Sequence, residues 1–234
     1  MRRLIPVLLL AVLSACAANG GGKRPAPALS TGQFAKSDVD RVSEAALREQ
    51  YFILQNLAEK LYKRNPKEWK KGGFARPEDA IQRLFATRHN WQFNELNGRY
   101  GTDAVLMALK PEFEGDRVFA VIAGLGGMVL TAFDGRYESY MFDDIDPQRI
   151  SNAARNVEIA VWKLSNARGA DGALLLLSNE MGTPPNLSFE REFGKMIGTL
   201  DLLSTIIAEK SNRTVVKVVQ SMATAVFLPV AAIK

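Results

Sequence analysis

A stretch rich in positive charge, residues 60–76, has the residue types most suited to binding. It contains seven basic residues and one acid, Glu68, with Tyr62, Trp69 and Phe74 between them. Cations beside aromatic rings suit anionic lipid headgroups, lipopolysaccharide phosphates or an acidic protein. The favoured interpretation is a solvated helix end whose cations complement the helix dipole and whose aromatic rings anchor a loop to the core. The candidate patch for an anionic partner comprises Lys60, Lys63, Arg64, Lys67, Trp69, Lys70, Lys71 and Arg76.

Acidic side chains gather further along, where Glu138 precedes Asp143, Asp144 and Asp146. Carboxylates are calcium ligands, but the spacing of an EF-hand loop is absent. Asp146 is followed by Pro147, which is a typical helix start with an acidic cap. Capping therefore explains these acids, and we predict no metal site.

The single histidine, His89, offers little basis for catalysis. One imidazole has no second histidine with which to bind a metal, and the chain has one cysteine, Cys16. Composition leaves a Ser-His-Asp triad open, but no serine lies in a Gly-x-Ser-x-Gly turn. We predict no catalytic residue and no cofactor, and a non-enzymatic protein is favoured over an enzyme.

Residues 118–133 form an uncharged, strongly apolar segment. Gly124, Gly126 and Gly127 within it are small enough to allow close helix approach. One interpretation is a membrane-inserted hairpin or an oligomer contact. The favoured one is a central core helix, because the segment is shorter than the ~20 residues that span a bilayer.

The remaining pattern is helical. Apolar residues recur at spacings of three and four, and capping residues precede most of these stripes. A short helix follows Pro66 and ends at Gly72-Gly73, while residues 174–177 and 215–219 are the best strand candidates. We predict an all-α fold, an irregular multi-helix bundle. The expected longer helices cover residues 37–64, 77–87, 102–109, 118–133, 147–168, 188–210 and 213–227.

Composition excludes several classes of protein. With 234 residues, 47% hydrophobic and 24% charged, the chain suits one globular domain or two small ones. A disordered polymer, a collagen-like repeat, a disulfide framework and a Cys/His zinc site do not fit. The formal net charge of +5 falls to +3 once a leader containing Arg2 and Arg3 is removed. A surplus this small argues against nucleic-acid binding.

The first residues have the features of an export signal. Arg2 and Arg3 precede an apolar stretch that is too short for a permanent membrane span. The sequence Leu13-Ser14-Ala15-Cys16 then resembles the lipobox of bacterial lipoproteins. The resemblance implies cleavage before Cys16 and lipidation of Cys16. Because Ala17 rather than aspartate follows, it also implies the outer membrane.

These observations predict three segments: a signal peptide at 1–15, the lipidated Cys16 with a flexible tether at 16–36, and one helical domain at 37–234. No family is recognised in the third segment. The favoured function is a lipid-anchored, periplasm-facing scaffold, assembly or accessory protein, held to the membrane by its lipid. An envelope protein complex or anionic lipid is the expected partner. The alternatives are an envelope hydrolase of wall or lipid substrates and a membrane-inserted oligomeric component that uses residues 118–133.

Overall fold

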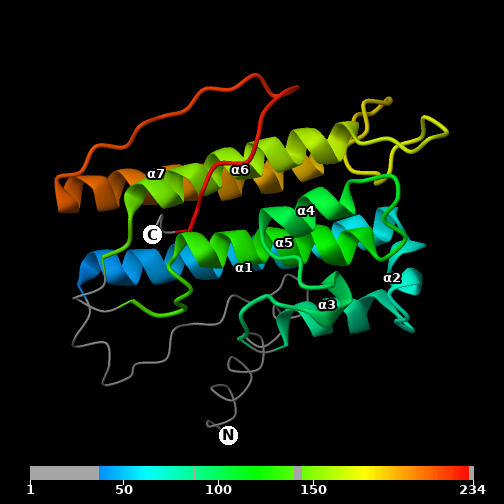
Figure 1. Cartoon of the computed structure of the whole chain (residues 1–234), viewed down its shortest axis with the longest axis horizontal. Coiled ribbons are helices and arrows are strands. Elements are labelled where there is room, and N and C mark those ends of the chain that lie inside the picture. The colour runs from blue at the N-terminus through cyan, green and yellow to red at the C-terminus, as the bar shows by residue number, and fades with distance from the viewer. Residues whose placement is uncertain (1–36, 87, 140–143, 232–234) are drawn as a thin grey trace, which may run out of the picture. The chain divides into compact units, whose positions relative to one another are not determined.

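The arrangement of helices is given by a computed structural model that describes residues 37–86, 88–139 and 144–231 (Figure 1). Within these residues the chain is 58% helical, with seven α-helices and no strand, so the predicted all-α class is confirmed. The lipobox, Cys16 and the tether lie outside the described residues. So do Thr87 and Asp143, which belonged to an expected helix end and to the acidic cluster.

The first helix, α1 (Asp38–Arg64), begins at a capping box, as the sequence indicates. The amide of Asp40 donates to Ser37 Oγ at 3.3 Å, and the amide of Ser37 donates to Asp40 Oδ2 at 2.7 Å. These bonds satisfy two amides that a helix start leaves without partners. An apolar stripe along α1 then packs against α5 (Arg117–Ala132) and α7 (Ser188–Ser211).

Helix α5 lies at the centre of the hydrophobic core. Asp116 caps it by accepting from the amide of Phe119 at 2.9 Å, and every residue from Arg117 to Leu130 is buried. Its neighbours are α1, α4 (Thr102–Ala108) and α6 (Pro147–Asn166). No helix among the described residues is both long and apolar enough to cross a bilayer.

The glycines of α5 are the points at which neighbouring segments approach most closely. A Cβ on Gly124 would lie 2.7 Å from the carbonyl oxygen of Gly101, and one on Gly126 would lie 2.4 Å from the Trp91 ring. A Cβ on Gly127 would meet Tyr100 at 2.7 Å. Real Cβ atoms essentially never approach so closely, so any larger residue would displace the segment that crosses α5.

The two other long helices, α6 and α7, pack against each other. Asp146 caps α6 by accepting from the amide of Gln148 at 2.9 Å, and Pro147 occupies the first turn. Helix α7 begins at Ser188, so the residue in the cap position is Leu187 rather than the expected serine. Two short helices, α2 (Glu68–Lys71) and α3 (Pro77–Phe85), complete the fold beside α5 and α1.

The helix expected at 213–227 is wrong. Asn212 ends α7 in a left-handed conformation (φ 51°), and the chain continues without a helix. Four valines lie within residues 215–219, and β-branched side chains disfavour a helix. Amide side chains of α6 supply hydrogen bonds instead. Asn156 donates to the carbonyl oxygen of Leu228 at 2.8 Å and accepts from its amide at 2.6 Å.

The strand candidate at 174–177 contributes only an isolated bridge between Arg168 and Leu174. Leu177, at its end, is held by Asn65, whose side chain accepts from the Leu177 amide at 2.8 Å and donates to its carbonyl oxygen at 2.9 Å. A single side chain therefore does here what a neighbouring strand would do. The other strand candidate, 215–219, has no strand partner among the described residues.

Candidate functional site

The candidate patch lies where α1 ends and α2 begins. Asn65 caps α1 through its side-chain amide, which donates to the carbonyl oxygen of Leu61 at 2.8 Å. Pro66 turns the chain out of α1, and Gly72 ends α2 one helical turn later. The basic residues are thereby distributed over two helices and the turns that flank them.

Four of the seven cations are engaged by acids of the same chain. Lys60 donates both to Glu192 and to the carbonyl oxygen of Ser188, at the start of α7. The four ion pairs are Lys60–Glu192 at 3.0 Å, Arg64–Glu180 at 3.1 Å, Lys71–Glu68 at 2.7 Å and Arg76–Asp79 at 3.0 Å. Lys60 and Arg64 thereby connect α1 to distant parts of the chain, whereas Lys71 and Arg76 pair with acids three residues away.

The other three cations, Lys63, Lys67 and Lys70, are exposed and form no ion pair with any described residue. Lys70 Nζ lies 5.2 Å from the centroid of the Trp69 ring, within the range of a cation–π contact. Trp69 is half-buried and packs against the core. We call Lys63, Lys67 and Lys70 the lysine triad. It is the part of the predicted patch that remains available to a partner.

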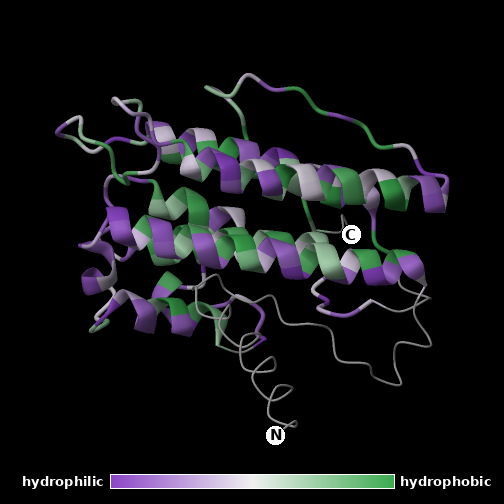
Figure 2. Ribbon diagram, turned by 180° about the vertical axis from the view of Figure 1, so that it is seen from behind, coloured by the Kyte–Doolittle hydropathy of each residue, from purple (hydrophilic) through white to green (hydrophobic). Residues whose placement is uncertain are grey.

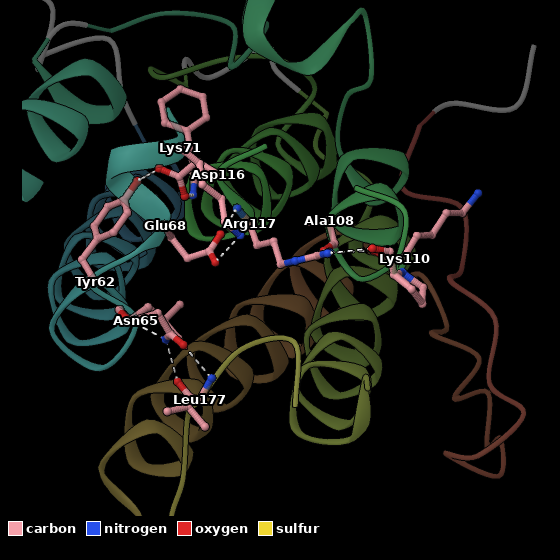
Figure 3. A network of polar contacts seen from close by, with 12 residues as sticks. Tyr62, Asn65, Glu68, Lys71, Ala108, Lys110, Asp116, Arg117 and Leu177 are labelled. Atoms are coloured by element: carbon pink, nitrogen blue, oxygen red, sulfur yellow. Dashed lines mark hydrogen bonds and ion pairs between the residues drawn. The ribbon is translucent and has the colours of Figure 1, made fainter. Parts of the chain in front are cut away.

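Glu68 fixes α2 to the core. It is 6% exposed, and its Oε2 accepts from the backbone amide of Arg117 at 2.8 Å (Figure 3). Its Oε1 accepts from Lys71 Nζ at 2.7 Å. A carboxylate at the N-terminus of α5 is favoured by the helix dipole and satisfies a free amide. The helix that carries Trp69 and Lys70 is therefore held in one place.

Asp116 lies beside Glu68 and links α5 to α1. Tyr62 donates from its hydroxyl to Asp116 Oδ2 at 2.9 Å, and the other oxygen caps α5 (Figure 3). Burial raises the pKa of Asp116 to about 6, although these two hydrogen bonds oppose that shift. Burial, followed by the charge of Asp116, also raises the pKa of Tyr62. Glu68 and Asp116 therefore both accept hydrogen bonds from the first backbone amides of α5.

Arg117 joins the end of α4 to the start of α5. Its guanidinium donates to the carbonyl oxygens of Ala108 at 2.5 Å, Lys110 at 2.7 Å and Pro111 at 3.1 Å. Carbonyls at the end of a helix lack partners within it, so this side chain satisfies groups that would otherwise need water. Burial lowers the pKa of Arg117. The arrangement is a structural clamp.

A shallow groove runs between α1 and α3, beside one member of the lysine triad. It has a volume of about 560 Å³, and its lining includes Lys63, Glu59 and Glu78 together with Ile81 and Phe85. Two carboxylates therefore flank Lys63, without forming an ion pair with it. The lysine triad is continuous with a mixed rather than a purely basic surface.

The remaining residues considered from sequence have local partners. The backbone amide of Trp91 donates to His89 Nδ1 at 2.9 Å, and His89 Nε2 lies 2.8 Å from the carbonyl oxygen of Leu84, so both ring nitrogens have backbone partners. Asp144 pairs with Arg213, and Asp146 caps α6. The described residues contain no group of three or more histidine, cysteine, aspartate or glutamate side chains arranged for a metal.

The sequence indicates the lysines but not the contact by which Glu68 fixes α2 to the core. Glu68 is the only acid in a basic stretch, and that isolation was the available signal for a specific role. Its partner, the amide of Arg117, lies 49 residues away, and nothing in the local pattern indicates that contact.

The chain matches no protein-family model, and comparisons with curated proteins and with solved structures give no match.

Proposed function

We propose that this protein is a lipid-anchored component of the bacterial envelope, facing the periplasm from the outer membrane and acting as a scaffold, assembly or accessory factor without catalysis. Two features support the proposal. The lipobox ending at Cys16 provides the anchor, and the lysine triad provides a surface for an anionic envelope component. Several acyl chains on one cysteine give attachment that is effectively permanent.

The observation that carries the proposal is the contrast between the two sets of cations. Lys60, Arg64, Lys71 and Arg76 are neutralised by acids of the same chain, whereas the lysine triad is exposed without ion pairs among the described residues. Helix α2, which carries Lys70 and follows Lys67, is fixed by the buried Glu68. A binding surface that is already in place loses less entropy when its partner arrives.

The expected strength follows from charge. A lysine near an anionic membrane surface contributes about 1 kcal/mol, so three contribute roughly 3 kcal/mol, or about two orders of magnitude in affinity. Salt screens such contacts, since the Debye length falls to ~10 Å at 0.1 M ionic strength. Binding should therefore weaken steeply as salt is added.

The test replaces Lys63, Lys67 and Lys70 together with glutamine. The control replaces Arg99, Lys110 and Arg191, which are also exposed, so that the net charge changes equally. Flotation with vesicles that contain or lack anionic lipid uses residues 30–234 of both proteins, because an acylated chain would float with either kind of vesicle. Co-purification of envelope proteins from membranes uses both full-length proteins. Helical circular dichroism checks that both remain folded.

We expect the triad variant to lose one of these two associations while the control retains it. Loss in the vesicle assay identifies anionic headgroups as the partner, and loss in the co-purification identifies an acidic protein. Retention of both associations by the triad variant, at low salt, would refute the proposal.

A further inference from the structure

A polar cavity lies between the last two helices and the chain that follows them. Its volume is about 470 Å³, within the range of roughly 300–1,000 Å³ that is typical of small-molecule sites. Figure 1 and Figure 2 both show the chain after α7 turning back along α6 and α7. We call residues 212–217 the returning segment. Ser151 of α6, five residues of α7 and five residues of the returning segment line the cavity.

The most deeply buried part of the lining offers two hydroxyl groups. Ser204 is 3% exposed, and its Oγ donates to the carbonyl oxygen of Pro147 at 2.8 Å. Ser151 is 4% exposed, yet its hydroxyl forms no hydrogen bond with any residue that the structure describes. Buried polar side chains nearly always have a hydrogen-bond partner. A group bound inside the cavity is therefore the expected partner of Ser151.

Two of the four charged residues in the lining are compensated by residues outside it. Asp201 pairs with Arg155 at 2.7 Å, and Arg213 pairs with Asp144. Neither Arg155 nor Asp144 lines the cavity. These two charges therefore have partners before any ligand binds.

The other two charged residues, Glu209 and Lys217, lie on different walls. Glu209 belongs to α7 and Lys217 to the returning segment, and both are exposed. Neither forms an ion pair with the other or with another residue of the described ranges. Gln148 holds the wall beside Lys217, because it accepts from the amide of Val216 at 2.8 Å and donates to its carbonyl oxygen at 3.0 Å. The cavity thus presents one negative and one positive group that do not neutralise each other.

We propose that this cavity binds a small zwitterion, either an amino acid or a short peptide. The ammonium group of the ligand pairs with Glu209 and its carboxylate with Lys217, while a polar atom between them bonds the hydroxyl of Ser151. A simple anion would be repelled by Glu209, and a simple cation by Lys217. A neutral sugar would satisfy the hydroxyl but neither charge. This inference depends neither on the lysine triad nor on the lipid anchor.

Three dipeptides that differ only in their end groups test the assignment. Alanylalanine carries both charges, its N-acetyl form lacks the ammonium group, and its C-terminal amide lacks the carboxylate. Their binding to the full chain in detergent micelles is measured by isothermal titration calorimetry at low salt. We expect the free dipeptide to bind at least about tenfold more tightly than either blocked form, because each block removes one charge-assisted hydrogen bond.

Two variants assign the two ends of the ligand. Glu209→Gln should bind the free and the N-acetylated dipeptide equally, and Lys217→Gln should bind the free and the amidated dipeptide equally. The matched controls are Lys110→Gln and Glu114→Gln, at exposed positions outside the lining. Both controls should keep the full preference for the free dipeptide, and circular dichroism checks that all four variants are folded.

Ser151→Ala separates binding from folding. Because the hydroxyl has no partner in the described part of the chain, its removal should not lower the melting temperature of the free protein, but it should weaken dipeptide binding severalfold. Ser204→Ala should instead lower the melting temperature, since it removes the hydrogen bond to Pro147. The proposal would be overturned if alanylalanine did not bind at millimolar concentration, if the blocked forms or glycerol bound equally well, or if Ser151→Ala bound it as tightly as the wild type.

Discussion

Replacing Asp116 with asparagine should remove a pH dependence that this buried carboxyl group imposes on folding. Asp116 is 7% exposed, and burial raises its pKa from 3.8 to about 6. In the unfolded chain the group returns to the ordinary range near 3.9. Between roughly pH 4 and 6, the folded protein therefore holds a proton that the unfolded chain has released.

The sign and size of the effect follow. The unfolding free energy falls as pH rises through this window, because the folded state binds more protons there. A shift from 3.8 to about 6 corresponds to about 3 kcal/mol. Asparagine keeps the shape and caps helices well, but it cannot ionise. Asp116→Asn should match the wild type near pH 4 and be up to about 3 kcal/mol more stable above pH 7.

The assay is urea denaturation of both proteins at stepped pH, with the difference in unfolding free energy plotted against pH. Subtraction cancels the other titrating groups, which the two proteins share. Tyr62→Phe provides a second check, because it removes a donor that favours the charged carboxylate. In that variant the folded-state pKa of Asp116 should rise further, so the fall in stability should extend to higher pH and become larger. A difference that stays constant with pH, or one that favours the wild type more as pH rises, would refute the reasoning.

Three further substitutions test the packing. Gly126→Ala would force a methyl group into the Trp91 ring, 2.4 Å away, and should cost about 1–3 kcal/mol in thermal denaturation. Gly198→Ala, in the interior of α7 with nothing within 4 Å, should instead stabilise by about 0.5–1 kcal/mol; equal effects of the two would contradict the geometry. Asn156→Ala removes both side-chain bonds to Leu228 and should make residues 214–231 more sensitive to limited proteolysis. Unchanged cleavage would show that those bonds do not hold the segment.

Helix starts could be predicted from the sequence because their signals are local. Ser37 begins α1 and Asp146 begins α6, and each capping side chain bonds an amide two or three residues away. The burial of α5 follows equally from the uncharged, apolar composition of the residues after Arg117. At the starts of α1 and α6, the residue that satisfies the first amides of the helix is the residue that directly precedes the helix in the sequence.

The wrong helix at 213–227 and the unpredicted contact between Glu68 and the Arg117 amide have a different origin. Apolar residues at 213–227 fit a helical spacing, yet the main chain there is held by Gln148 and Asn156 of α6, more than 65 positions earlier. The partners of the basic stretch are as remote, since Glu180 lies 116 residues from Arg64 and Glu192 lies 132 residues from Lys60. Sequence shows which residues carry charge, whereas long-range packing decides which charges remain available.

Neutral side-chain amides hold the long non-helical segments of this fold, at Asn65–Leu177, Gln148–Val216 and Asn156–Leu228. An uncharged amide neither titrates in the physiological range nor attracts counterions. A change in pH or in salt concentration would therefore leave these hydrogen bonds intact, whereas it would alter the strength of the exposed ion pairs. The end of the chain is held at three successive residues, because Asn152 donates to the carbonyl oxygen of Pro229 and Arg149 to that of Val230 beside the Asn156–Leu228 pair, so the loss of one of these side chains would leave two attachments in place.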